Sequence, residues 1–164
     1  FITGMNTMVT GYILMRQLGL LNSLLGLIIY YGAQPIVFNT LILTAFMKGQ
    51  PKELDEAAYI DGASYWQTFW HVGLPLARPA LLTVNVFNFM KYYNDFIHPL
   101  LFIRDPDKYP LSVAIYSMAQ SMSYKADWVT LFAGFVIMMI PTIIVYSVFQ
   151  NYITQNLNIG ALKG

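Results

Sequence analysis

The sequence predicts an all-α membrane protein, a helical transmembrane bundle, and two observations support this fold class. Hydrophobic residues make up 57% of the chain and charged residues only 10%, whereas charged residues make up roughly 25% of a typical soluble domain. Apolar windows in the chain are also long enough to cross a bilayer, whose hydrocarbon core of about 30 Å needs about 20 helical residues. We therefore expect a single transmembrane domain over residues 1–164.

The apolar segments can be placed in order along the chain. It opens inside an apolar stretch without a basic leader, so we interpret its start as the end of a longer helix, with N-terminal helices absent. The windows that follow are Asn22–Met47, Leu76–Phe102 and Trp128–Phe149, which gives a fragment of about four membrane segments. Pro35 and Pro141 fall inside two of these windows, where each is expected to kink the helix. A static kink and a functional hinge both remain open.

Residues 104–126 separate the second window from the third, and they begin with a turn-rich stretch, Arg104–Pro110. The rest predicts a short helix that lies at the membrane interface rather than crossing it. Its apolar positions, set among serines and a glutamine, are Val113, Tyr116, Met118 and Met122.

The basic residues do not decide the orientation of the chain, although cytoplasmic loops usually carry an excess of Lys and Arg. One side of the membrane would hold Lys48, Lys52, Arg78 and Lys163, and the other Arg16, Arg104, Lys108 and Lys125. The two groups are equal, so the orientation must come from another observation.

Several classes of function are disfavoured by composition. The net charge is only +1 and Lys and Arg do not cluster, which argues against a nucleic-acid partner. Cysteine is absent, so thiol catalysis, disulfides and Cys-ligated zinc are excluded. His71 and His98 are far apart and show no metal-ligand spacing, so we expect no metal site. No nucleophile is paired with a base in the polar loop between the first two windows, and we do not expect an enzyme.

This polar loop, residues 50–75, is rich in acidic residues. Pro51 suits the first turn of a helix, and Glu53, Asp55 and Glu56 follow at the positive end of its dipole. Gly62 can adopt the left-handed conformation that ends a helix. The positions that share one face of this helix are Leu54, Ala57, Ala58 and Asp61. The small alanines leave the backbone accessible, as in a docking surface.

A second helix is predicted to follow at once. Ser64 and Gln67 fit a capping box, in which each side chain bonds the backbone of the other residue. This helix exposes Trp66, Phe69 and Trp70, and we expect Pro75 to end it.

The spacing within the loop resembles the EAA loop of permease subunits from bacterial ABC importers. The matching residues are Glu56-Ala57-Ala58, three residues, Gly62, nine residues, Val72, one residue, and Leu74-Pro75. Only Val72 departs from the usual isoleucine. Further stretches resemble the carbohydrate-uptake branch, which is related to the maltose permeases: RQLGLLN at Arg16–Asn22, PKELDEAAYIDGAS at Pro51–Ser64, YNDF at Tyr93–Phe96 and NIGALKG at Asn158–Gly164.

The resemblance implies a multi-pass protein of the bacterial cytoplasmic (inner) membrane. In such importers two permease subunits form the translocation path, each presents its EAA loop to a subunit of an ATPase dimer, and an extracytoplasmic solute-binding protein delivers the sugar or oligosaccharide. ATP and Mg would then bind the partner ATPase, and this chain would bind no cofactor. Residues 50–75 would be cytoplasmic and residues 104–126 extracytoplasmic. The residues implied to couple the chain to the ATPase are Glu56, Ala57, Ala58, Asp61, Gly62 and Pro75, with Trp66, Phe69 and Trp70 supporting them.

The window Leu76–Phe102 carries a stripe of polar residues at helical spacing. A charged residue inside a bilayer costs roughly 2.5–3.5 kcal/mol on insertion scales unless it faces the bundle interior or water. The stripe is therefore predicted to point inward and to line the solute path, with Tyr92 and Tyr93 offering flat faces to sugar rings. Its members are Asn85, Asn88, Lys91, Asp95 and His98.

Several alternatives for this stripe and for the solute stay open. Lys91 and Asp95 could pair with each other, or Lys91 could extend to the interface, and either would serve helix packing alone. Lys91 could instead recognise an acidic or phosphorylated sugar, because the related permeases commonly carry a small residue at this position. Finally, the permease could import a non-sugar solute, or Asp95, Lys91 and His98 could form the proton relay of a secondary transporter.

Overall fold

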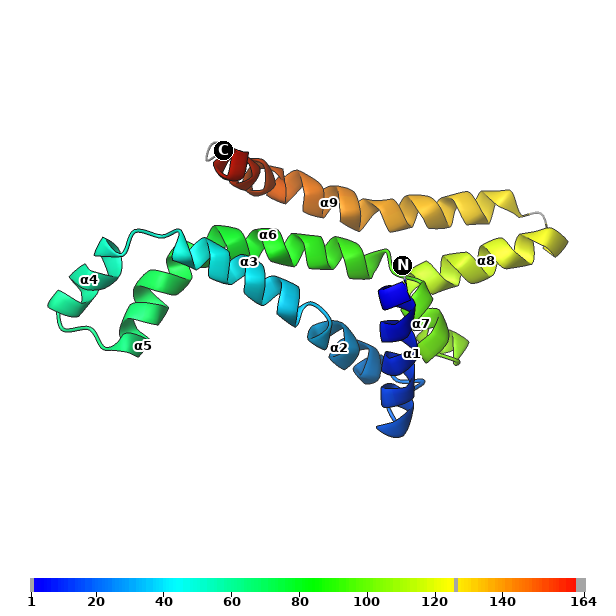
Figure 1. Ribbon diagram of the computed structural model, residues 1–164. Helices are drawn as coiled ribbons and strands as arrows, with labels where there is room; N and C mark the ends of the chain where they lie inside the picture. Colours follow the sequence, from blue (N-terminus) through cyan, green and yellow to red (C-terminus); the bar gives the residue numbers. More distant parts are fainter. Residues whose placement is uncertain (1, 126, 162–164) are drawn as a thin grey trace. The chain divides into compact units, whose positions relative to one another are not determined.

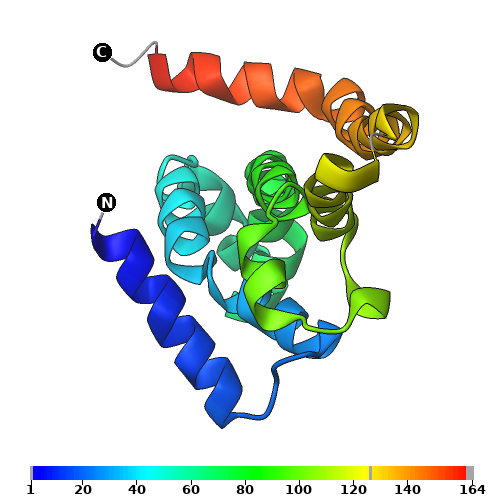
Figure 2. The same cartoon turned by 90° about the vertical axis from the view of Figure 1, so that its right-hand side faces the viewer.

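The computed structural model describes the backbone of residues 2–125 and 127–161 and the side chains of residues 7–121 and 127–150. The described part consists of helices joined by turns and short irregular segments, and it contains no strand (Figure 1, and turned by 90° in Figure 2), which confirms the predicted all-α class. Some predicted features lie outside the described side chains: Met122, Lys125, Lys163 and the tail Asn158–Gly164.

The helices follow one another along the whole described chain. In order they are α1 (Ile2–Gln17), α2 (Leu24–Ala33), α3 (Ile36–Lys48), α4 (Glu53–Ile60), α5 (Tyr65–Thr68), the π-helical turn η1 (Phe69–Gly73), α6 (Leu74–Tyr93), α7 (Ile97–Phe102), the 3₁₀ turn η2 (Pro106–Lys108), α8 (Leu111–Lys125) and α9 (Trp128–Ala161). They fall into two compact units. The first contains the residues up to Pro35 and Phe89–Ile144, and the second Ile36–Asn88 and the residues from Val145 onward.

Length and composition identify one described helix segment, Trp128–Gln150 of α9, that could cross a membrane by itself. The pair α2 and α3 would be a second span if the two bent helices are counted as one. These segments correspond to the predicted windows Trp128–Phe149 and Asn22–Met47. α1 and α6 are helical where the sequence predicts helices, although neither passes the same test within the described residues.

The two prolines predicted to kink helices behave differently. At Pro35 the chain bends by 40° between α2 and α3, because a proline has no N–H for the carbonyl one turn earlier. Pro141 lies inside α9, which continues as one helix on both sides of it. The structure therefore locates a helix break at the first proline only.

The window Leu76–Phe102 is not one continuous helix, which corrects our prediction. α6 ends at Tyr93 and α7 begins at Ile97. The Asp95 side chain replaces helical backbone bonds at this point. Its Oδ1 accepts hydrogen bonds from the N–H groups of Ile97 and His98 at 3.0 and 3.4 Å. Pro99 lacks the N–H that would bond the Asp95 carbonyl, and that carbonyl accepts Ser112 Oγ at 2.8 Å instead.

The core of the first unit lies where α1, α2 and α7 meet. Buried side chains from these helices form one cluster: Met15, Leu27, Tyr30 and Phe102. The rings of Tyr30 and Phe102 meet edge to face with centroids 4.8 Å apart, a favourable aromatic geometry. Gly26 is required in α2, because a Cβ there would overlap the carbonyl oxygen of Leu20. The core therefore depends on close approach of the backbone as well as on apolar contacts.

Asn22 joins the turn after α1 to the turn after α7. Its φ is +57°, in a left-handed region that asparagine tolerates better than most residues. Its Oδ1 accepts the N–H groups of Arg104 and Asp105 at 3.0 and 2.9 Å. Lys108 pairs with Asp105 at 3.1 Å, and this hydrogen bond lowers the pKa of the Asp105 carboxyl below its usual value. The side chain of Asn22, in the turn after α1, thus binds the backbone of the turn after α7 and holds the two turns together.

The polar loop lies in the second unit and contains α4, α5 and η1 (Figure 1). α4 begins at Glu53, so Pro51 precedes the helix and does not occupy its first turn as predicted. Pro75 does not end the second helix either, since α5, η1 and α6 follow without a gap. The π turn explains this, because the Leu74 N–H reaches back to the Phe69 carbonyl and widens the turn next to the proline ring.

Candidate functional site

The turn between α4 and α5 has the hydrogen bonds of a Schellman motif. Gly62 has a φ of +81°, which a residue with a side chain adopts only under strain. Its N–H bonds the Tyr59 carbonyl at 3.0 Å, and the Ala63 N–H bonds the Ala58 carbonyl at 2.9 Å. The predicted left-handed glycine is therefore confirmed, and it reverses the chain within a few residues.

The predicted capping box is also present at the start of α5. Ser64 N–H donates to Gln67 Oε1 at 2.8 Å, and Gln67 N–H donates to Ser64 Oγ at 3.4 Å. Thr68 adds a bond from its hydroxyl to the Ser64 carbonyl at 3.2 Å and is buried. These local bonds fix α5 directly after the turn.

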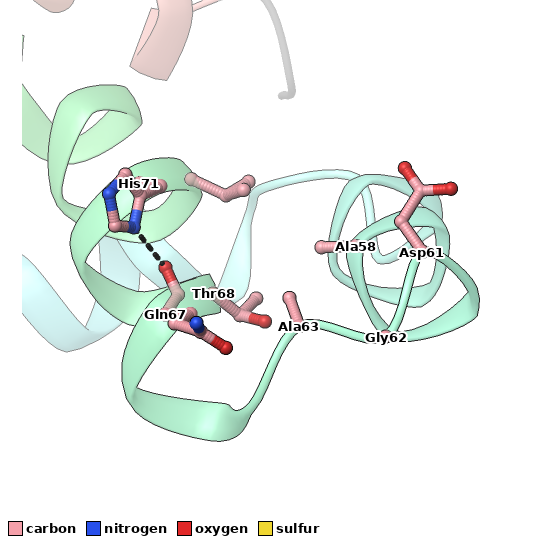
Figure 3. A pocket seen from close by; sticks show the side chains of 8 residues that line it. Ala58, Asp61, Gly62, Ala63, Gln67, Thr68 and His71 are labelled. Atoms are coloured by element: carbon pink, nitrogen blue, oxygen red, sulfur yellow. Dashed lines mark hydrogen bonds between the residues drawn. The ribbon is translucent and has the colours of Figure 1, made fainter.

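α4 and α5 enclose an open pocket of about 320 Å³ (Figure 3). Ala58 and Asp61 line it from the side of α4, and Gln67 and His71 line it from the opposite side. His71 donates from Nδ1 to the Gln67 carbonyl at 3.0 Å, so its other ring nitrogen is left for another partner. The remaining lining residues are Gly62, Ala63, Thr68 and Val72. Small side chains and one carboxylate suit a protein segment that carries a basic residue better than they suit catalysis.

The acidic residues in the first turn of α4 have no cationic partner among the described residues. Glu53, Asp55 and Glu56 occupy the first turn and are exposed, and in the described residues the ion pairs are His98–Asp95 and Lys108–Asp105. Ala57 and Pro75, the other residues expected to couple the chain, are exposed as well. The loop therefore presents net negative charge at its surface.

The three aromatic residues predicted to support the loop do not share one environment. Phe69 is half-buried and lines a second, smaller space with Met47, Tyr59 and Gly73. Trp66 and Trp70 line neither this space nor the first pocket, and they are 67% and 58% exposed. Of the three aromatic residues, Phe69 lines one of the two spaces and the two tryptophans line neither.

A second polar site lies in the first unit, at the break between α6 and α7. Asp95 Oδ2 accepts a hydrogen bond from the Tyr31 hydroxyl at 2.9 Å and one from His98 Nδ1 at 2.5 Å. Lys91 does not pair with Asp95. Its Nζ lies 3.5 Å from Gln34 Oε1 and 5.2 Å from the centre of the Tyr92 ring. The alternative in which Lys91 neutralises Asp95 is therefore wrong.

Aromatic rings complete this second site. Tyr31 and Tyr92 stack with centroids 4.4 Å apart and planes at 28°. The Tyr92 hydroxyl is buried and has no hydrogen-bond partner among the described residues. Gln34 Nε2 donates to the Tyr30 hydroxyl at 2.9 Å, which connects the site to the apolar core.

The structure brings together four of the six residues predicted to line the solute path, namely Lys91, Tyr92, Asp95 and His98. Asn85 and Asn88 belong to the other unit, and the side-chain amide of Asn85 donates to the Leu81 carbonyl of its own helix at 2.8 Å. Sequence reasoning missed Tyr31 and Gln34. The available signal was a pair of polar side chains next to Pro35 inside an otherwise apolar window.

Comparison with known proteins identifies relatives over most of the chain. It is 37% identical to the diacetylchitobiose uptake system permease protein NgcG of Streptomyces coelicolor, over 91% of this chain and 49% of the relative. It is 36% identical to the trehalose/maltose transport system permease protein MalG of Thermococcus litoralis, over 91% and 53%. It is 31% identical to the galactooligosaccharides transport system permease protein GanQ of Bacillus subtilis, over 93% and 54%. The chain thus spans about half the length of these curated relatives.

The sequence model of one protein family matches almost the whole chain, residues 1–159. Its description as an inner membrane component of a transport system agrees with the apolar helices. The match also includes the loop whose glycine turn and capping box the structure shows in detail. This chain belongs to the family of binding-protein-dependent transport system inner membrane components.

Proposed function

We propose that the chain is the part of an ABC importer permease subunit that helps to form the translocation path and couples it to ATP hydrolysis. Hydrolysis takes place on a partner ATPase dimer, which carries ATP and Mg, and a second permease subunit completes the path. An extracytoplasmic binding protein delivers the solute. We propose a sugar or oligosaccharide as this solute, because the relatives named above are permeases for such compounds.

The observation that carries the coupling proposal is the pocket beside the Gly62 turn. Ala58 and Asp61 line one side of it, and the acidic first turn belongs to the same short helix, α4. An exposed short helix with small residues and unpaired carboxylates suits a cleft that supplies basic donors. The Schellman turn and capping box support a rigid connection from this helix through η1 into α6.

We further propose that the polar site around Tyr31, Lys91, Tyr92 and Asp95 contacts the solute. Broken helices that bring polar groups together inside a membrane are a common feature of transporter binding sites. The stacked Tyr31 and Tyr92 rings add the flat apolar surface that sugar rings favour. A secondary transporter would use the same charges without ATP, so dependence on ATP separates the two functions.

The decisive experiment reconstitutes the importer in vesicles with its ATPase, second permease and binding protein. ATP-dependent uptake of a sugar, together with ATP hydrolysis stimulated by the loaded binding protein, is expected. Gly62→Val and Glu56→Lys should each abolish the stimulation and leave membrane insertion intact. Uptake without ATP, or full coupling in both variants, would refute the proposal.

The proposed orientation has its own test, which benefits from the absence of native cysteine. Single Lys52→Cys and Lys108→Cys variants provide unique labelling sites in this chain. A membrane-impermeant maleimide should reach the first site only from the cytoplasmic side and the second only from outside. Labelling of both sites from the same side would refute this assignment.

A further inference from the structure

Trp66 and Trp70 form an aromatic face that no other described part of the loop covers. The two residues are four positions apart and therefore lie on the same side of the helical stretch formed by α5 and η1. They are 67% and 58% exposed. Each meets the ring of Phe69 edge to face, with centroids 6.2 and 5.4 Å apart. We refer to this pair as the Trp66–Trp70 face.

The Trp66–Trp70 face lies close to the point where two apolar helices end. α3 ends at Lys48, and α6 begins at Leu74. A Cβ on Gly73 would lie 3.7 Å from the terminal methyl of Met47. The end of α3 and the start of α6 are therefore side by side, and together they mark one boundary of the apolar part of this unit.

Helix geometry gives the distance of each tryptophan from this boundary. Trp70 precedes Gly73 by three residues and Trp66 by seven, which corresponds to about 4.5 and about 10.5 Å along a helix with a rise of about 1.5 Å per residue. The headgroup layer on each side of a bilayer is about 5–8 Å thick, the difference between the whole bilayer and its hydrocarbon core. A helix along the bilayer normal would thus place Trp70 inside this layer and Trp66 just beyond its outer edge, from where its indole ring can still reach the headgroups.

The chemistry of the surrounding side chains fits the same layer. An indole ring combines a large apolar surface with one N–H donor, and tryptophan is enriched at membrane–water interfaces for this reason. Lys48 is exposed at the end of α3, at the same boundary, where basic side chains are attracted to anionic headgroups. We propose that the Trp66–Trp70 face inserts into the phospholipid headgroup layer and anchors the loop at the base of α6.

The competing occupant is the partner ATPase, and the position of the face argues against it. Neither tryptophan lines the pocket beside Gly62 or the space beneath Phe69. Coupling and anchoring would therefore use different sides of the same short helical stretch. This inference requires only that α3 and α6 enter a membrane, and it holds whatever solute the protein transports.

Fluorescence quenching by brominated lipids tests the proposal in the reconstituted importer. Vesicles contain phosphatidylcholine and phosphatidylglycerol, with bromines on the acyl chains either just below the headgroup or near the bilayer centre. Bromines below the headgroup should quench wild-type emission more strongly than bromines at the centre. Trp70→Phe should remove the largest part of this difference, and Trp66→Phe should remove a smaller part.

Ile60→Trp provides the matched control, because Ile60 is 86% exposed on α4 in the same loop. It should add emission that neither set of bromines quenches. The proposal is overturned if Trp70→Phe leaves the quenching unchanged, or if the emission of Trp70 responds to omission of the ATPase subunits and not to bromines. Stimulated ATP hydrolysis is measured on the same vesicles, so a failure of the proposed import function would be recognised separately.

Discussion

The hydroxyl of Tyr31 donates a hydrogen bond of 2.9 Å to the carboxylate of Asp95, 64 residues further along the chain. Tyr31 lies in the last turn of α2, just before the bend at Pro35, and Asp95 lies in the break between α6 and α7. Backbone and side-chain polar groups at helix breaks in a membrane must find partners within the protein. One carboxylate therefore connects the two breaks, and His98 and Ser112 add further bonds to the same residue.

Replacement of Tyr31 by phenylalanine should weaken this connection. The variant keeps the ring and removes a hydrogen bond to a charged group, so we expect a loss of about 1–2 kcal/mol in stability. The thermal unfolding temperature of the purified complex measures the effect. Tyr146→Phe is the control, because Tyr146 is 52% exposed, and it should change stability by less than about 0.5 kcal/mol. Equal effects in both variants would contradict the role of the bond.

Lys91→Met should leave stability unchanged within about 0.5 kcal/mol, because Asp95 is already satisfied by Tyr31 and His98. Asp95→Ala should instead cost about 2 kcal/mol or more, since it removes several bonds at once. If Lys91 recognises an acidic sugar, its replacement also lowers uptake of that sugar relative to a neutral one. Lys91→Arg keeps the charge and should retain the preference. A large stability loss in Lys91→Met would count against this arrangement.

The loop could be predicted in detail because its determinants are local. Gly62 and the pair Ser64 and Gln67 act on backbone groups within five residues of themselves, and their preferences are visible in a short stretch of sequence. The prediction that Pro75 ends the second helix was wrong. It assumed that a proline interrupts a helix, whereas the π turn η1 accommodates the proline ring and the helix continues. The exposure predicted for Trp66 and Trp70 agrees with the structure, and their support of the coupling residues stays a prediction.

The second site could be predicted only in part. A period of three and four residues placed Asp95 and His98 on the same helix as Lys91, because periodicity within an apolar window always favours one continuous helix. The break depends on partners that are distant in sequence, above all Tyr31 and Ser112. Such contacts have no local signature. Lys91, Asp95 and His98 were found from the sequence, whereas Tyr31 and Gln34 and the bonds that they make were not.

Gly62→Val should uncouple ATP hydrolysis from the loaded binding protein. A left-handed conformation costs a residue with a Cβ about 1–2 kcal/mol, so the Schellman turn would open. Gly62→Asn should retain much of the stimulation, because asparagine tolerates this conformation. Gly19→Val controls for strain itself: Gly19 has a φ of +68° and lies in the turn after α1, outside the loop. If Gly19→Val uncouples hydrolysis as strongly as Gly62→Val does, the coupling role of the Gly62 turn is refuted.

Ser64→Ala should loosen the start of α5. The loss of an N-cap hydrogen bond typically costs about 1 kcal/mol, and hydrogen exchange of the backbone amides of Tyr65–Thr68 should become faster. Ser23 offers a matched control, because it also precedes a helix and makes no side-chain cap bond. Ser23→Ala should leave exchange at the start of α2 unchanged. Similar acceleration at both helices would show that the capping box contributes nothing.

Tyr92→Phe should have the opposite sign to Tyr31→Phe, although the two rings stack 4.4 Å apart. The Tyr92 hydroxyl is buried and has no partner among the described residues, and an unsatisfied buried polar group costs about 1–3 kcal/mol. Its removal should therefore leave stability unchanged or raise it by about 1 kcal/mol, as measured by thermal unfolding. Both variants keep the aromatic ring and lose only a hydroxyl, so a change in packing does not explain a difference in stability between them. If Tyr92→Phe also lowers sugar uptake at unchanged stability, the hydroxyl serves the solute, whereas a fall in stability would show that it has a partner inside the folded complex.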